Sequence, residues 1–217
     1  SGIYSSSVGI NKAIQKTLMK ESGFATPSFL SLHRTEWTNE KNKKSIQEKI
    51  NKEIGFPCVV KSAHQGSSIG ITILHDNDPA NLDAALNHAF FIRALTKSEW
   101  NKLNDEDKAE WVRSTTDIRE GIGCPLIVHD KQGSTRLHHP ESILDKINSA
   151  FAEGSDGLTL ESCDAETEVV IEGFIEGKEF SCIVIRREDG TPVALPPTEI
   201  RKGKELFDYR SKYLPGL

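Results

Sequence analysis

Residues 55–74 read Gly55-Phe56-Pro57-Cys58-Val59-Val60-Lys61-Ser62-Ala63-His64-Gln65-Gly66-Ser67-Ser68-Ile69-Gly70-Ile71-Thr72-Ile73-Leu74. The apolar run Phe56–Lys61 predicts a short buried strand that ends in a lysine, because such runs between turn signals are typical of sheet interiors. The alternating stretch Ile69–Leu74 predicts its hairpin partner. A small, hydroxyl-rich loop therefore joins two antiparallel strands, with a cation where the first strand ends.

The loop after Lys61 has a composition that suits phosphate. Glycines let backbone N–H groups approach a ligand closely, and Ser67 and Ser68 offer hydroxyl groups to phosphate oxygens. No Gly-Lys-Ser/Thr sequence opens a helix here, so the stretch is not a Walker A motif. An ordinary hairpin turn, with the lysine reaching to solvent, fits the same residues. The loop by itself leaves both interpretations open.

A second candidate site begins at the strand predicted over Glu168–Glu172. The glycine-bounded connection Gly173–Gly177 follows it and leads into another strand. Such a connector can present backbone donors and acceptors to a purine edge, and the carboxylate of Glu179, seven residues after Glu172, can take two ribose hydroxyls. A plain β-hairpin with solvated acids is the alternative.

Other candidates depend on their neighbours in the fold. Phe207–Tyr213 mixes aromatic and cationic residues, which also suits a solvated loop. The adjacent His138 and His139 point to opposite faces of a strand, which argues against a shared metal ion. The sequence around Ser67 does not have the His and Asp pattern of a serine hydrolase, so it does not support that function.

Periodicity and turn residues predict the remaining elements. Predicted helices cover Val8–Ser22, Lys44–Ile54, Ala80–Phe91 and Glu141–Phe151, and helix-prone stretches surround Trp100 and Trp111. Predicted strands cover Thr26–Leu32, Pro125–His129, Thr135–His139, Leu158–Leu160, Lys178–Arg187 and Pro192–Arg201. The Pro196-Pro197 pair limits the last of these to a sheet edge or a bulge.

Composition narrows the class of protein. Of 217 residues, 36% are hydrophobic, and 27 Lys and Arg against 32 Asp and Glu give a net charge of −5. No run of 18 apolar residues occurs, so we expect no membrane association. An acidic chain is a poor partner for nucleic acid, so any bound phosphate is expected to be small. Four cysteines without a C-x-x-C pair predict reduced thiols in a cytoplasmic protein.

Taken in order, these motifs resemble the central part of the D-alanine–D-alanine ligase family of ATP-grasp enzymes. The segments that carry the resemblance are Ser1–Ala13, Gly55–Gly70, Val170–Phe180 and Phe207–Tyr213. The resemblance implies an α+β, ATP-grasp fold. Its first subdomain has a mainly antiparallel sheet with flanking helices, and its second subdomain is only partly present. ATP is expected to lie between the two.

We expect the first lobe at residues 1–173 and the start of the second lobe, with the lid segment, at residues 174–217. Segment 92–165 is far longer than the few residues that the family places there. It is predicted to be an insertion that decorates the edge of the domain or contacts a partner. Deletion of residues 95–160, with a short linker in their place, is expected to leave ATP binding intact.

The resemblance also implies roles by position. Phosphates would be held by Lys12 and Lys61, adenine would meet Glu172 and the backbone that follows it, and Glu179 would take the ribose. The implied ATP-binding residues are Lys12, Lys61, Ser67, Ser68, Glu172, Gly173, Phe174, Ile175 and Glu179. The implied catalytic residues are Ser67, Lys212 and Tyr213, because the serine pairs with the lid tyrosine and Lys212 approaches the transferred phosphoryl group. Mg²⁺ ligands would lie outside this chain.

The implied reaction is ATP-dependent joining of two D-alanines through an acyl phosphate, a step of peptidoglycan precursor synthesis. Asn11 stands where the family has aspartate, Gln65 where it has glutamate and Gly173 where it has lysine. ATP binding is expected to survive these changes, whereas the preferred amino acid stays open.

Two alternatives remain: a ligase for other amino acids, and a noncatalytic ATP-binding or interaction module whose working surface is segment 92–165. The chain begins Ser1-Gly2 without an initiator Met, so we expect a piece of a longer ligase that is inactive alone. ATP and amino acids are the expected small-molecule partners, and a homodimer of the full-length protein stays open.

Overall fold

The computed structural model describes residues 2–201, which fall into two compact units. The first unit is Ser1–Phe174 and the second is Ile175–Leu217. The predicted lid segment Phe207–Tyr213, with Lys212 and Tyr213, lies outside the described residues.

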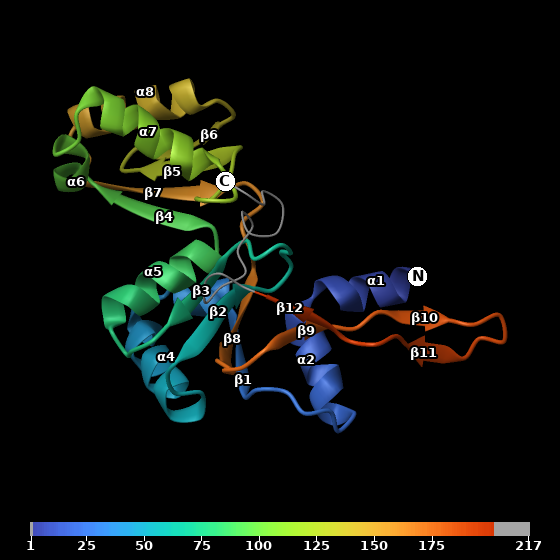
Figure 1. Cartoon of the computed structure of the whole chain (residues 1–217). Coiled ribbons are helices and arrows are strands. Elements are labelled where there is room, and N and C mark those ends of the chain that lie inside the picture. Colours follow the sequence, from blue (N-terminus) through green and yellow to red (C-terminus); the bar gives the residue numbers. More distant parts are fainter. Residues whose placement is uncertain (1, 202–217) are drawn as a thin grey trace. The chain divides into compact units, whose positions relative to one another are not determined.

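A four-stranded antiparallel sheet forms the base of the first unit (Figure 1). Its strands, in spatial order, are β1 (Phe29–His33), β8 (Glu168–Gly173), β2 (Cys58–Ser62) and β3 (Ile71–Leu74). The predicted hairpin is confirmed, because β2 pairs with β3 with Val60 opposite Thr72. The motif around Glu172, more than a hundred residues later, returns as the other neighbour of β2.

Helices α3 (Arg34–Trp37), α4 (Glu40–Glu53) and α5 (Pro79–Ala89) supply the core that packs on this sheet. Helix α5 starts as its sequence predicts, because the Asp78 side chain accepts from the backbone of Ala80 and Asn81. Helix α4 begins four residues before its predicted start, because the side chain of Asn39 caps it. Burial of each large apolar side chain contributes about 1.5–3 kcal/mol. The core includes Leu32, Trp37, Ile50, Val60, Leu86, Phe90 and Ile171.

The N-terminal segment differs from its prediction. Two helices, α1 (Ile3–Ile10) and α2 (Lys12–Glu21), replace the single helix predicted over Val8–Ser22. Asn11 separates them with an extended backbone (φ −93°, ψ 106°), and its side chain accepts a hydrogen bond from the Ile14 N–H. Asparagine favours such N-cap positions because its side-chain oxygen satisfies a free N–H of the first turn. The prediction was wrong because helical periodicity continues across this cap.

Segment 92–165 contains a second antiparallel sheet with helices of its own (Figure 1). The sheet order is β4 (Ile92–Thr96), β7 (Gly157–Ser162), β5 (Leu126–Asp130) and β6 (Gly133–Leu137). The helices are α6 (Lys97–Asn101), α7 (Asp105–Thr116) and α8 (Pro140–Ala152). The predicted hairpin between β5 and β6 is confirmed.

This second sheet has a separate hydrophobic core, in which two tryptophans anchor their helices. Trp100 is buried and meets Trp111 edge to face, with ring centroids 5.6 Å apart. The two ends of the segment lie next to each other, because the Ser162 N–H donates to the Phe91 carbonyl. Arg34 fixes the same junction through an ion pair with Glu161.

The described part of the second unit, residues 175–201, contains four short strands: β9 (Glu179–Ser181), β10 (Val184–Arg186), β11 (Pro192–Ala194) and β12 (Thr198–Ile200). They pair as β9 with β12 and β10 with β11, around the predicted turn at Gly190. The single strand predicted over Lys178–Arg187 is wrong, because residues 182–183 interrupt it. The stretch Pro192–Arg201 is interrupted at residues 195–197, where the proline pair was expected to limit it. Pro196 and Pro197 lack backbone N–H groups, so they cannot continue a ladder. Within the described part of the chain, no helix has the length and apolar character that a membrane span requires.

Candidate functional site

The serine loop, defined here as residues 63–70, joins β2 to β3 in an unusual conformation. Ser67 and Ser68 have positive φ values of 54° and 63°, which few residues other than glycine adopt. The Ile69 N–H donates to the Gly66 carbonyl at 3.0 Å, which closes a turn around the two serines. Successive positive φ values inside such a turn are typical of type I′ geometry. The two predicted serines thus lie at the tip of a defined turn.

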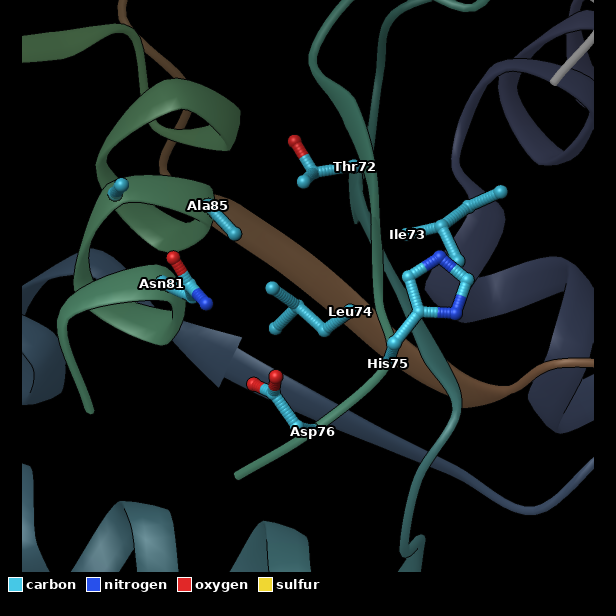
Figure 2. A pocket seen from close by; sticks show the side chains of 8 residues that line it. Thr72, Ile73, Leu74, His75, Asp76, Asn81 and Ala85 are labelled. Carbon is cyan, nitrogen blue, oxygen red and sulfur yellow. The ribbon is translucent and has the colours of Figure 1, made fainter. Parts of the chain in front are cut away.

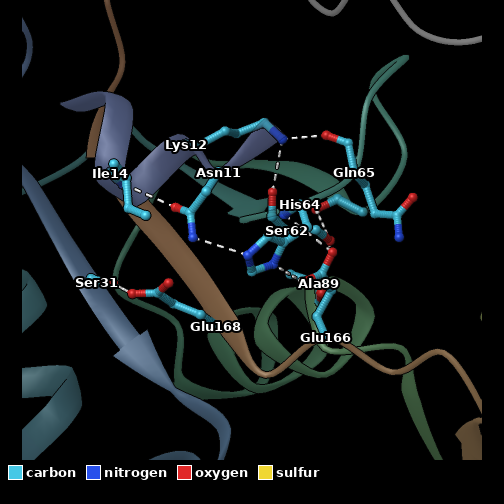
Figure 3. Close-up of polar contacts among 11 residues, drawn as sticks. Asn11, Lys12, Ile14, Ser31, Ser62, His64, Gln65, Ala89, Glu166 and Glu168 are labelled. Atoms are coloured by element: carbon cyan, nitrogen blue, oxygen red, sulfur yellow. Dashed lines mark hydrogen bonds and ion pairs between the residues drawn. The ribbon is translucent and has the colours of Figure 1, made fainter. Parts of the chain in front are cut away.

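Gly70 closes the serine loop at a place where no larger residue fits. Its φ is +66°, and a Cβ atom added there would lie 2.0 Å from the Ser62 Oγ. That hydroxyl donates to the Ala89 carbonyl at 2.7 Å, so it is held at the end of α5 (Figure 3). The base of the loop is therefore fixed by a glycine requirement and by a buried hydrogen bond.

Lys12, the first residue of α2, is bound to the same loop (Figure 3). Its ammonium group donates to the carbonyl of Ser62 at 3.0 Å and to that of Gln65. Burial lowers the pKa of Lys12, with nearby Glu166 acting in the opposite direction and Lys61 adding to the decrease. Ser62 directly follows Lys61, so the ammonium group of Lys12 is anchored next to Lys61 at the end of β2.

A chain of hydrogen bonds supports Lys12 from behind. The Asn11 side chain caps α2 with its oxygen, so its amide nitrogen faces the His64 Nε2 at 2.9 Å (Figure 3). An amide N–H can only donate, so this Nε2 accepts and Nδ1 donates to the Glu166 Oε2 at 2.9 Å. Glu166 is only 4% exposed and also accepts from the His64 N–H.

Sequence reasoning missed this role of His64 and Glu166. The two residues are 102 positions apart in the chain, and Glu166 follows the second sheet in a segment with no motif of its own. A pairing of this kind leaves no local pattern. Only the return of the chain from β7 to β8 brings the carboxylate to the serine loop.

Glu172 on β8 forms ion pairs with two lysines, Lys61 and Lys16. It lies opposite Val59 of β2, and the side chain of Lys61 shares that face because residues two apart in a strand point the same way. Lys61 pairs with the Glu172 Oε1, and Lys16 on α2 pairs with the Oε2 at 2.5 Å. Burial alone would raise the pKa of Glu172, but the two ammonium groups hold the pKa below its usual value.

We call Lys12, Lys16, Lys61, Glu166 and Glu172 the charge cluster. Its three ammonium groups exceed its two carboxylates by one charge. The excess cation lies beside a loop of small, hydroxyl-bearing residues. Electrostatically, the arrangement favours an anionic ligand over a cationic one.

Some of the residues predicted to contact ATP lie outside the charge cluster or already form other hydrogen bonds. The backbone N–H groups of Gly173 and Phe174 already donate, to Ser28 and Pro57 respectively. Ile175 and Glu179 belong to the second unit. No group of three or more His, Cys, Asp or Glu residues that could hold a metal ion occurs among residues 2–201.

Two cavities of about 380 Å³ lie elsewhere on the first unit. One is formed by β3 and α5, where Thr72, Leu74, His75, Asp76 and Asn81 are among the lining residues (Figure 2). The other lies near the ends of α2 and α4 and includes Lys20, Phe24 and Ile54. Neither cavity is lined by a member of the charge cluster.

The site agrees with the expected ATP-grasp class: it combines an antiparallel sheet, a lysine near the end of one strand, a serine loop and a carboxylate on the adjacent strand. The VanG D-Ala:D-Ser ligase from Enterococcus faecalis has this fold, with a TM-score of 0.51 and 19% identity over 96% of this chain and 37% of that one. The family model described as D-ala D-ala ligase C-terminus matches residues 18–94 and 92–216. The chain belongs to this family, which confirms the predicted resemblance and the fold class.

Curated relatives show how much of a ligase the chain represents. The D-alanine–D-alanine ligase of Desulforamulus reducens is 26% identical over the whole chain, which covers 45% of that relative. The ligase of Bacillus cytotoxicus is 35% identical over 89 residues, or 41% of this chain and 24% of that protein. The chain thus spans less than half the length of either relative, and the first match includes segment 92–165.

Proposed function

We propose that the protein containing this chain is an ATP-dependent ligase that joins two D-alanines through an acyl phosphate. The observation that carries the proposal is the placement of Lys12 and Lys61 in one charge cluster, beside the serine loop, in a member of this ligase family. A net charge of +1 in the charge cluster, beside a hydroxyl-rich loop, suits the phosphates of a nucleotide. The reaction would take place in the cytoplasm, as a step of peptidoglycan precursor synthesis.

The proposed reaction has two steps, and each of the predicted site residues has a role in it. A carboxylate is a poor electrophile, so ATP first transfers its terminal phosphoryl group to it. The amine of the second amino acid then attacks the acyl phosphate, and inorganic phosphate leaves. Lys12 and Lys61 offset the negative charge of the phosphates, and Ser67 and Ser68 cover them from the loop. Glu172 and residues 173–175 would face adenine, Glu179 the ribose, and Lys212 and Tyr213 the transferred phosphoryl group.

The two carboxylates of the charge cluster do not suit Mg²⁺. Glu172 is occupied by two lysines and Glu166 by His64, so neither is free to coordinate a cation. The proposal therefore assigns no Mg²⁺ ligand to residues 2–201, and no step above depends on one.

The test is phosphate release from ATP by the full-length protein, measured across a panel of D- and L-amino acids. We expect release that depends on D-alanine and yields D-alanyl-D-alanine. A stronger response to a different amino acid would replace D-alanine as the substrate. A folded protein that binds ATP but releases no phosphate with any amino acid would favour the noncatalytic module.

A further inference from the structure

Glu172 has one more partner than the proposed function needs. Its side chain is 8% exposed, and its two oxygens are shared between Lys61 on β2 and Lys16 on α2. The proposed function uses Lys61 for the ATP phosphates, whereas Lys16 has no assigned role. The second lysine therefore calls for a physical explanation.

The proposed task of Lys61 conflicts with its present contact. The same ammonium group that is to hold a phosphate is paired with Glu172. A buried carboxylate that loses its counter-charge is strongly destabilised, because burial penalises the charged form. With Lys61 as its only cationic partner, Glu172 would hold that lysine back and weaken phosphate binding.

Lys16 is built to remain in place when Lys61 moves. Its ammonium group also donates to the Thr26 Oγ1 at 2.7 Å and lies 5.4 Å from the centroid of the Phe29 ring. Its side chain is 14% exposed, compared with 26% for Lys61. Lys16 is thus the more enclosed and the more fully bonded of the two lysines, and Lys61 is the more accessible to a ligand.

We infer that Lys16 is a positioning residue that keeps Glu172 neutralised, so that Lys61 can exchange the carboxylate for an ATP phosphate. The inference rests on the proposed function and adds a residue to it. Lys16 touches neither the nucleotide nor the reacting atoms. Its effect on ATP passes through Glu172 to Lys61, and this indirect route predicts a specific dependence on the carboxylate.

The test is a double-mutant cycle in the full-length protein, with ATP affinity as the readout. Lys16→Met is expected to weaken ATP binding about tenfold, the usual order of coupling between contacting residues. On the Glu172→Gln background the same substitution is expected to cause no further loss, because no carboxylate then competes for Lys61. Adenosine, which has no phosphate, is expected to bind equally well to the Lys16→Met variant and to the unmodified protein.

Two control variants make the cycle specific, and a third variant is a substitute for Lys16→Met. Lys16→Arg keeps the charge and is expected to restore ATP affinity. Lys20→Met removes an exposed lysine from the same helix, whereas the ion pairs of Glu172 are with Lys16 and Lys61, so it is expected to leave ATP affinity unchanged. Lys16→Gln, which can still bond to Thr26, replaces Lys16→Met on both backgrounds if that variant does not fold.

The outcomes separate this inference from the proposal beneath it. An unchanged ATP affinity in Lys16→Met, or an equal loss with and without the Glu172 carboxylate, overturns the inference while leaving the proposed function standing. An equal loss of adenosine binding also overturns it, because the effect would then be general. An unmodified protein that binds no ATP overturns the proposed function and this inference together.

Discussion

The ammonium group of Lys12 donates a hydrogen bond to the backbone carbonyl of Ser62 across 3.0 Å. The backbone N–H of Lys12 also donates, to the carbonyl of Ala63 at the same distance. The first residue of α2 is thus fixed to the end of β2 by its backbone and by its side chain. Because Lys61 immediately precedes Ser62, these two bonds set the position of one lysine relative to the other.

Removal of Lys61 is expected to weaken ATP binding at least tenfold. A charge-assisted phosphate contact contributes about 1.5–3 kcal/mol, and about 1.4 kcal/mol corresponds to a factor of ten. Calorimetric titration of the full-length Lys61→Ala variant with ATP measures the effect. Lys52→Ala, an exposed lysine in the last turn of α4, is the matched control. An ATP affinity equal to that of the control would remove Lys61 from the site.

Glu166→Gln is expected to lower the free energy of unfolding by about 1–3 kcal/mol, the cost of disturbing a buried charged acceptor. The carboxylate accepts from both the ring and the backbone of His64, so an amide group cannot reproduce both bonds. Denaturant unfolding measures the change, with the exposed Glu48→Gln as its control. Equal stability of the two variants would show that the bonds to His64 contribute little.

Gly70→Ala and Gly66→Ala form a matched pair within the serine loop. Gly70 combines a positive φ with a Cβ position 2.0 Å from the Ser62 Oγ, whereas a Cβ at Gly66 would meet nothing within 4 Å. We expect Gly70→Ala to lower the free energy of unfolding by about 1–3 kcal/mol, the usual cost of a strained backbone. Gly66→Ala is expected to be close to neutral. Thermal unfolding distinguishes the two, and similar melting temperatures would argue against the loop geometry.

Deletion of residues 95–160, with a short linker, tests what the second sheet does. The first sheet has a separate core and is expected to stay folded. Ile69 of the serine loop, however, packs against the second core. We therefore expect weaker ATP binding after the deletion, in contrast to the expectation from sequence. Unchanged affinity would show that segment 92–165 does not support the loop, and aggregation would show that the first sheet needs it.

Capping residues and short apolar patterns in the sequence correctly predicted the helices and hairpins whose stabilising contacts lie within a few residues. Asp78 and Pro79 mark the start of α5 because a cap and an N1 proline act within one turn. The hairpin of β2 and β3 follows from residues 55–74 in the same way. Asn11 shows the limit of periodicity, because its side chain ends one helical pattern and starts another without changing the spacing of apolar residues.

The candidate site was predictable only in part, for a related reason. Lys61 and the two serines stand in one motif, and the resemblance to a known family supplied Lys12 and Glu172. Lys16 carried no separate signal, because a lysine one turn along an exposed helix resembles any solvated lysine. Its role depends on the register that places Glu172 next to β2, and such a register is a property of the folded sheet.

The most direct test of the account is a crystal structure of the full-length protein with a non-hydrolysable ATP analogue. The account predicts phosphate oxygens about 2.7–3.2 Å from the ammonium nitrogens of Lys12 and Lys61, beneath Ser67 and Ser68. It also predicts that Glu172 is then paired with Lys16 alone. A nucleotide whose phosphates contact neither lysine would contradict the central claim.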